Sequence, residues 1–139
     1  MGGEPDAAAE QRMRKLIVAF LVAEGAGVGL WWGILLAWPA ARQPFLAPGA
    51  PDSTLLALLG ADLLLYAGGA WVAAYGLARR RAWAWTALCV HAGAALYAAL
   101  SGLALPLVSG GGWLGALLMA PSLVGLPWAL WWLRREGRQ

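Results

Sequence analysis

The stretch LIVAFLVAEGAGVGLWWGILLAW, residues 16–38, decides the fold class of this chain. A helix rises about 1.5 Å per residue, so the stretch is long enough to cross a hydrocarbon core about 30 Å thick. One side chain breaks its apolar character, because Glu24 lies near the middle. An acid at that depth costs on the order of 3 kcal/mol on insertion scales. The presence of an acid at this position predicts a functional site within the membrane.

The composition of the whole chain extends this interpretation. Its 139 residues are 61% hydrophobic and only 12% charged, whereas a soluble domain carries about 25% charged residues. Three further apolar stretches follow, at about residues 55–77, 82–105 and 113–133. The sequence therefore predicts an all-α, polytopic integral membrane protein. We expect a four-transmembrane-helix bundle that forms a single membrane domain over residues 1–139, with residues 1–11 as a flexible tail.

The basic residues predict one fixed orientation in the membrane. Three precede the first stretch, three join the second to the third, three follow the fourth, and only Arg42 lies on the other side. By the positive-inside rule the N and C termini are then cytoplasmic, in the inner (plasma) membrane of the cell. We interpret the run Arg79, Arg80 and Arg81 as a topology anchor in preference to a specific lipid site. Nine arginines against one lysine favour a GC-rich prokaryotic source.

Two more ionisable residues lie inside apolar stretches: Asp62 in the second and His91 in the third. The rise per residue places Glu24 and His91 at one depth, roughly 3–5 Å to the cytoplasmic side of the midpoint. It places Asp62 roughly 6 Å to the outer side. We therefore expect two tiers of polar contacts, one joining Glu24 to His91 and one joining Asp62 to Tyr97 or Trp31.

Helical periodicity adds the direction in which these side chains point. Glu24 shares a face with Phe20, Gly27, Val28 and Trp31, so an aromatic wall can lie beside the acid. His91 lies on a face of alanines, which predicts that it points into the bundle, because small residues mark helix contacts in membranes. A second small-residue face on the first stretch is expected to pack inside the bundle; it consists of Gly25, Gly29 and Gly33.

These patterns give two sets of candidate residues. The candidate catalytic residues are Glu24, Asp62 and His91. The candidate ligand-binding residues are Glu24, Trp31, Asp62, Tyr66, His91 and Tyr97. A protonated acid that only pins two helices together is the structural alternative for either carboxyl.

Several kinds of site are not expected. A single cysteine, Cys89, cannot form a disulfide within one chain. One histidine and one cysteine on opposite sides of a helix do not supply the four ligands of a tetrahedral metal site, so we predict no metal and no cofactor. Four serines are expected to lie in loops or far from His91, which excludes a serine–histidine catalytic pair; they are Ser53, Ser101, Ser109 and Ser122.

Three functions remain open. The first is a membrane binding or transport protein with an intramembrane site for a hydrophobic or cationic small molecule, coupled to protons. The second is an acid–base isomerase or cyclase acting on a lipid or terpenoid, with Glu24 or Asp62 as the acid and His91 as the base. The third is a non-catalytic subunit of a membrane complex. Membrane lipids and a small molecule are the expected partners, and a homo-oligomer is possible; no nucleic acid is expected.

Overall fold

A computed structural model describes residues 7–136, and the chain in this range is helical with no β-strand. The elements are α1 (Ala7–Ala37), η1 (Pro39–Phe45), α2 (Asp52–Leu56), α3 (Leu59–Ala61), η2 (Asp62–Ala67), α4 (Gly68–Ala78), α5 (Ala84–Ser109) and α6 (Trp113–Glu136). Four helical segments are long and apolar enough to span a membrane: Ala8–Ala37, Asp52–Ala78, Ala84–Ser109 and Trp113–Arg135. The predicted all-α, four-helix class is confirmed, and the helices are those of a multi-pass membrane protein.

Two predicted boundaries need correction. Helix α1 begins at Ala7, so residues 7–11 are helical, whereas residues 1–6 of the expected tail lie outside the described part of the chain. An Arg14–Glu10 pair at 3.4 Å, one turn apart, supports this early start. Helix α5 continues beyond residue 105 to Ser109 with Pro106 inside it. Proline removes one donor but keeps its carbonyl, which accepts the Gly110 N–H at 2.9 Å.

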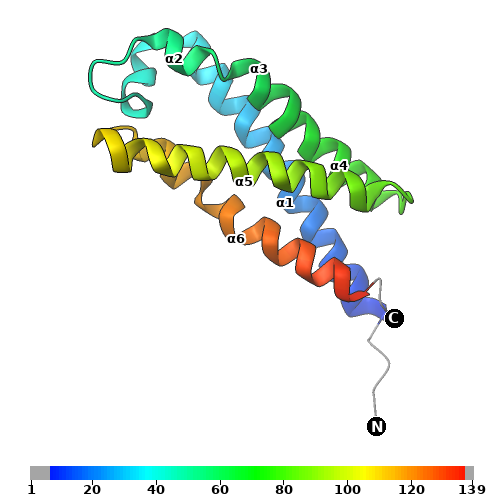
Figure 1. The fold of residues 1–139 in the computed structure, drawn as a ribbon. Helices are drawn as coiled ribbons and strands as arrows, with labels where there is room; N and C mark the ends of the chain where they lie inside the picture. Colours follow the sequence, from blue (N-terminus) through cyan, green and yellow to red (C-terminus); the bar gives the residue numbers. More distant parts are fainter. Residues whose placement is uncertain (1–6, 137–139) are drawn as a thin grey trace.

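The helix backbones pack in the order α1, α4, α5 and α6, whereas α1 and α6 meet through side chains, with Phe20 of α1 against Gly125 of α6. The start of α1, the turn between α4 and α5, and the end of α6 lie at one end of the bundle (Figure 1). The loop after α1 and the turn between α5 and α6 lie at the other end, where Pro48 packs on Gly111. The opening left between α1 and α6 positions the site described below.

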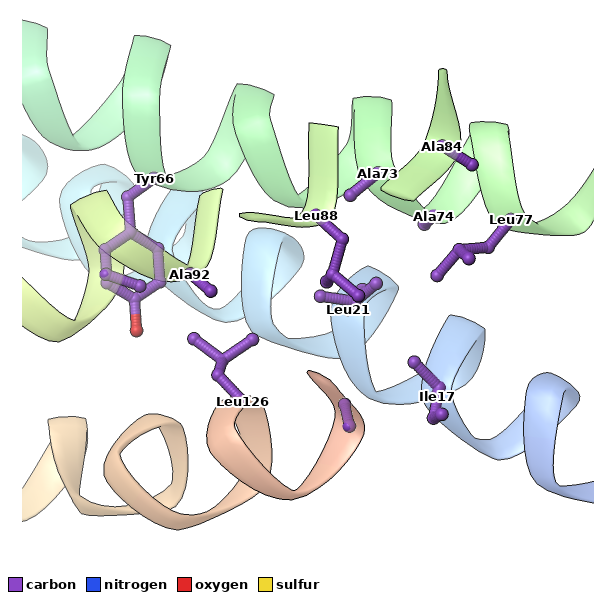
Figure 2. Packing of buried hydrophobic residues seen from close by; sticks show 12 residues of the cluster. Ile17, Leu21, Tyr66, Ala73, Ala74, Leu77, Ala84, Leu88, Ala92 and Leu126 are labelled. Carbon is purple, nitrogen blue, oxygen red and sulfur yellow. The ribbon is translucent and has the colours of Figure 1, made fainter. Parts of the chain in front are cut away.

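The core of the bundle is built from alanine and leucine side chains. Figure 2 shows Leu21, Leu88 and Leu126 pointing toward one another from α1, α5 and α6, and all three are fully buried. Alanines of α4 and α5 fill the space between these two helices, including Ala73, Ala84, Ala92 and Ala95. Small side chains let helix backbones approach closely, which is the main source of packing energy in a membrane.

The second span contains a wide turn in its middle, because η2 is a π-helix. A π-helical turn holds an extra residue and usually appears as a short insertion in an α-helix. Here it carries Asp62 at its start and Tyr66 one turn later, and both side chains are buried. The wide turn thus presents Asp62 and Tyr66 to the interior.

Candidate functional site

Four polar side chains, one from each span, meet in the middle of the bundle. We call Glu24, Tyr66, His91 and Ser122 the Glu24 cluster. Glu24 Oε2 lies 3.0 Å from His91 Nε2, and Glu24 Oε1 accepts a hydrogen bond of 3.0 Å from the Tyr66 hydroxyl. The Ser122 hydroxyl donates to Glu24 Oε1 and also contacts the Tyr66 hydroxyl. One carboxyl group therefore connects α1, η2, α5 and α6.

Three groups that can donate hydrogen bonds surround the Glu24 carboxyl group. An ionised carboxylate only accepts hydrogen bonds, and here two hydroxyls and one ring nitrogen surround it. Among the described residues, His91 Nδ1 has no hydrogen-bond partner. A proton on that nitrogen would leave a buried donor unpaired, which costs more than an unpaired lone pair. With its proton on Nε2, His91 would donate to Glu24 and leave only a lone pair unpaired on Nδ1.

The position of His91 depends on a glycine of the neighbouring helix. Its side chain is fully buried, as the alanine face of α5 predicts. A Cβ atom added to Gly69 would lie 3.3 Å from His91 Nδ1 and 3.5 Å from His91 Cβ. The Tyr66 ring packs edge-on against the imidazole, with centroids 5.6 Å apart. His91 is thus fixed behind Glu24 by contacts on two sides.

A cavity of about 450 Å³ lies in front of the Glu24 cluster, between α1, η2 and α6. Glu24, Asp62, Tyr66 and Ser122 are its polar lining residues, and no lysine, arginine or histidine among residues 7–136 lines it. The remaining walls are apolar, with Phe20, Gly27, Val28 and Trp31 from α1. These are the residues that periodicity places on the face of Glu24. The cavity has the size and mostly apolar character of a small-molecule site.

The cavity opens at the side of the bundle. Leu30 and Ile34 of α1 and Leu118 of α6 line it and are also exposed on the outer surface. In a membrane such side chains face acyl chains. The mouth of the cavity between α1 and α6 is therefore lined by exposed apolar side chains.

Asp62 forms a second polar contact outside the Glu24 cluster. Its carboxyl oxygen accepts a 3.1 Å hydrogen bond from Trp32 Nε1, and the residue is only 8% exposed. The partner of Asp62 is thus Trp32 and not the expected Trp31 or Tyr97. Trp31 lines the cavity, with its own Nε1 buried and without a partner among residues 7–136.

Two of the remaining predictions about single residues change in the structure. Tyr97 is 76% exposed on α5 and does not line the cavity, so it lies outside the site. Ser122 was expected to lie far from His91, yet it is buried in α6 and belongs to the same cluster. The signal for Ser122 was available, since it lies near the middle of the predicted span 113–133. A hydroxyl at that depth needs a partner within the bundle.

The other titratable groups do not extend the site. Within the described residues no three histidine, cysteine, aspartate or glutamate side chains gather closely enough to hold a metal ion. Cys89 is exposed on the outer face of α5. Compared with known proteins, the chain matches no family model, and no curated protein or solved structure matches it significantly.

Proposed function

We propose that the protein binds and transports hydrophobic organic cations, which enter the cavity between α1 and α6 from the bilayer. The observation that carries this proposal is the pairing of apolar walls with two acids, Glu24 and Asp62, and no basic side chain. A neutral lipid would need neither acid, and each acid is costly to keep in hydrocarbon. A cation compensates that cost because it restores charge balance where the dielectric is low.

The walls of the cavity support the same class of ligand. Trp31 and Phe20 present aromatic surface beside Glu24, and aromatic rings attract cations through their faces. Quaternary phosphonium and ammonium compounds have a delocalised or shielded charge, so they lose less hydration than a metal ion when they leave water. They match a cavity that has few hydrogen-bonding groups.

The two acids have different surroundings, which supports different roles. Glu24 has three donors, whereas among the described residues Asp62 receives a hydrogen bond only from Trp32. Donors stabilise the charged form of a carboxyl group. In the proposed cycle Glu24 stays ionised and attracts the cation, while Asp62 releases a proton when the cation binds and regains it when the cation leaves.

The distribution of charge supports the proposed orientation in the plasma membrane. The basic residues Arg12, Arg14 and Lys15 at the start of α1 share one end of the bundle with the arginines around the α4–α5 turn and the end of α6. Arg42 lies after α1 at the opposite end. The positive-inside rule then assigns the arginine-rich end to the cytoplasm.

Equilibrium binding of tetraphenylphosphonium to the purified protein tests the proposal. Tetraphenylborate has nearly the same shape and the opposite charge, so it is the matched control ligand. We expect the phosphonium to bind and the borate not to bind. Equal binding of the two ions would show that hydrophobicity alone determines binding. If neither ion binds, the Glu24 cluster serves only to hold the helices together.

Variants identify the groups that act on the cation. In Glu24→Gln the bound cation loses one buried charge partner, a contact worth about 1.5–3 kcal/mol. We therefore expect this variant to bind the cation roughly 10- to 100-fold more weakly. Glu10→Gln removes an acid of the same helix outside the cavity and should leave binding unchanged. Proteoliposomes extend the test to transport, because an outward-directed cation flux driven by a pH gradient should disappear in Asp62→Asn.

A further inference from the structure

A second hollow lies at the arginine-rich end of the bundle, away from the cavity that contains Glu24. It measures about 570 Å³, and all four spans contribute to its walls. Its charged and aromatic lining residues are Glu10, Arg14, Arg80, Arg81, Arg134 and Trp85. Four arginines against one glutamate give this hollow an excess of positive charge. Nothing in the cation-binding proposal uses it.

One acid of the described chain forms an ion pair with one of these four arginines. Glu10 pairs with Arg14 at 3.4 Å. Within residues 7–136, neither Arg80, Arg81 nor Arg134 forms an ion pair with an acid. Three guanidinium groups from the α4–α5 turn and from α6 therefore face one hollow without counter-charge from the described side chains. Guanidinium groups match the oxygen atoms of a phosphate and bind them in pairs.

The backbone at Arg80 adds a second observation. Helix α4 ends in a Schellman motif, in which Arg81 N–H donates to Gly76 O at 2.9 Å and Arg80 N–H donates to Leu77 O at 3.3 Å. The motif places Arg80 in the left-handed region, with φ of 50°, and it is the only non-glycine residue among the described ones with positive φ. Glycine is the usual residue at this position. An arginine there carries conformational strain, which is common at binding sites.

The wall of the hollow also fits the region where lipid headgroups lie. Trp85 is half-exposed beside the arginines, and tryptophan prefers the membrane interface, because its ring is apolar and its N–H is polar. The hollow lies where the apolar part of the bundle ends, because Leu77 and Leu133 line it together with the arginines. A molecule with a phosphate and acyl chains would contact the arginines and the leucines at once.

We infer that this hollow, which we call the Arg80 site, binds the phosphate of an anionic phospholipid headgroup. The arginines hold the phosphate oxygens, Trp85 lies at the level of the glycerol backbone, and the acyl chains leave along the surface of the helices. The Arg79–Arg81 run is then more than a topology anchor. The lipid would join the α4–α5 turn to α1 and α6 and so stabilise the bundle.

The test uses the purified full chain in a neutral detergent. Short-chain phosphatidylglycerol is titrated, and the bound lipid is counted by native mass spectrometry while the unfolding midpoint is followed. Phosphatidylcholine with the same chains and inorganic phosphate form two further arms. We expect phosphatidylglycerol to bind and to raise the midpoint, and the other two to do neither. Equal effects of both lipids, or binding of inorganic phosphate as tight as that of phosphatidylglycerol, would overturn the proposal.

Two pocket variants and one matched control complete the test. Arg80→Gly removes the guanidinium and supplies the residue that the turn prefers, so the fold is kept. Arg134→Gln and Arg135→Gln remove neighbouring charges, but Arg135 stacks on Trp131 at 3.9 Å and does not line the hollow. Each pocket variant should weaken phosphatidylglycerol about tenfold, the loss of one charge-assisted contact. An equal loss in Arg135→Gln would show attraction to the whole basic end and would also overturn the Arg80 site.

Discussion

His91 Nε2 lies 3.0 Å from Glu24 Oε2, and this contact joins α5 to α1 across the interior of the bundle. The two residues are 67 positions apart in the chain. Both side chains are buried, with exposed fractions of 0% for His91 and 7% for Glu24. The contact therefore affects stability as well as the chemistry of the cavity.

Removing the imidazole should destabilise the folded protein. In His91→Ala the Glu24 carboxylate loses one donor and a space opens behind it, so we expect a loss of about 1–3 kcal/mol in the free energy of unfolding. Unfolding in mixed detergent micelles measures it. Cys89→Ala on the exposed face of the same helix should have little effect. Equal stability of both variants would mean that the Glu24–His91 contact contributes nothing to the fold.

Tyr66 and Ser122 should behave as one unit. Tyr66→Phe keeps the ring that packs on His91 but removes the hydroxyl, and Ser122→Ala removes the second hydroxyl. Since both hydroxyls contact each other and the same carboxyl oxygen, we expect a coupling energy of about 0.5–3 kcal/mol in a double-mutant cycle. Strict additivity of the two substitutions would contradict the shared network.

Two glycines of the same face on α1 should respond differently to alanine. A Cβ on Gly25 would lie 2.5 Å from Trp71 Nε1, whereas a Cβ on Gly29 meets no atom within 4 Å. Gly25→Ala should therefore destabilise the α1–α4 contact by about 1–3 kcal/mol. Gly29→Ala should be neutral or slightly stabilising, because alanine is the better helix former. A drop in stability for Gly29→Ala that depends on protein concentration would instead reveal a dimer through this face.

Binding of tetraphenylphosphonium should depend on pH if Asp62 exchanges a proton. Protons compete with the cation for the carboxylate, so the affinity falls as the pH is lowered and rises as it is raised. Release of one proton per bound cation corresponds to a change in apparent Kd of about tenfold per pH unit in the coupled range. In Asp62→Asn the same titration should be flat. A pH dependence that survives this substitution would assign the proton to another group.

The orientation can be measured with cysteine labels. In a Cys89→Ser background, Arg79→Cys and Ser109→Cys place single thiols at opposite ends of the bundle. The positive-inside rule predicts that a membrane-impermeant maleimide applied to whole cells labels the second and not the first. The reverse pattern would contradict the cytoplasmic position of the arginine-rich end.

Length, apolar composition and helical period were enough to predict the four helices and the face of α1 that lines the cavity. Depth alone paired Glu24 with His91, because both lie at similar distances from the midpoint of their spans. Depth did not separate Trp31 from Trp32, since consecutive residues point about 100° apart and the neighbour that each one meets depends on tertiary packing. Tyr97 follows His91 by six positions, about 240° around α5, so it faces away.

Ser122 was missed for a different reason. A hydroxyl that only completes a carboxylate's set of donors leaves no motif, and only the position of Ser122 near the middle of the span 113–133 indicated that it needs a partner. The π-helical turn at η2 had no signal in the sequence, because such an insertion depends on what the span packs against and has no fixed residue pattern. Both features arise from contacts between spans.

The wide turn at η2 also has a geometric consequence for the span that contains it. One surplus residue shifts the phase of the helix by about 100° between the segments on either side. The membrane-crossing rod from Asp52 to Ala78 can therefore aim Asp62 toward α1 and α6 while Gly69 and Ala73 stay in register with α5. Deleting a single residue from the turn would rotate one half of this helix about its axis relative to the other half. A deletion there should therefore reduce the stability of the bundle far more than a substitution.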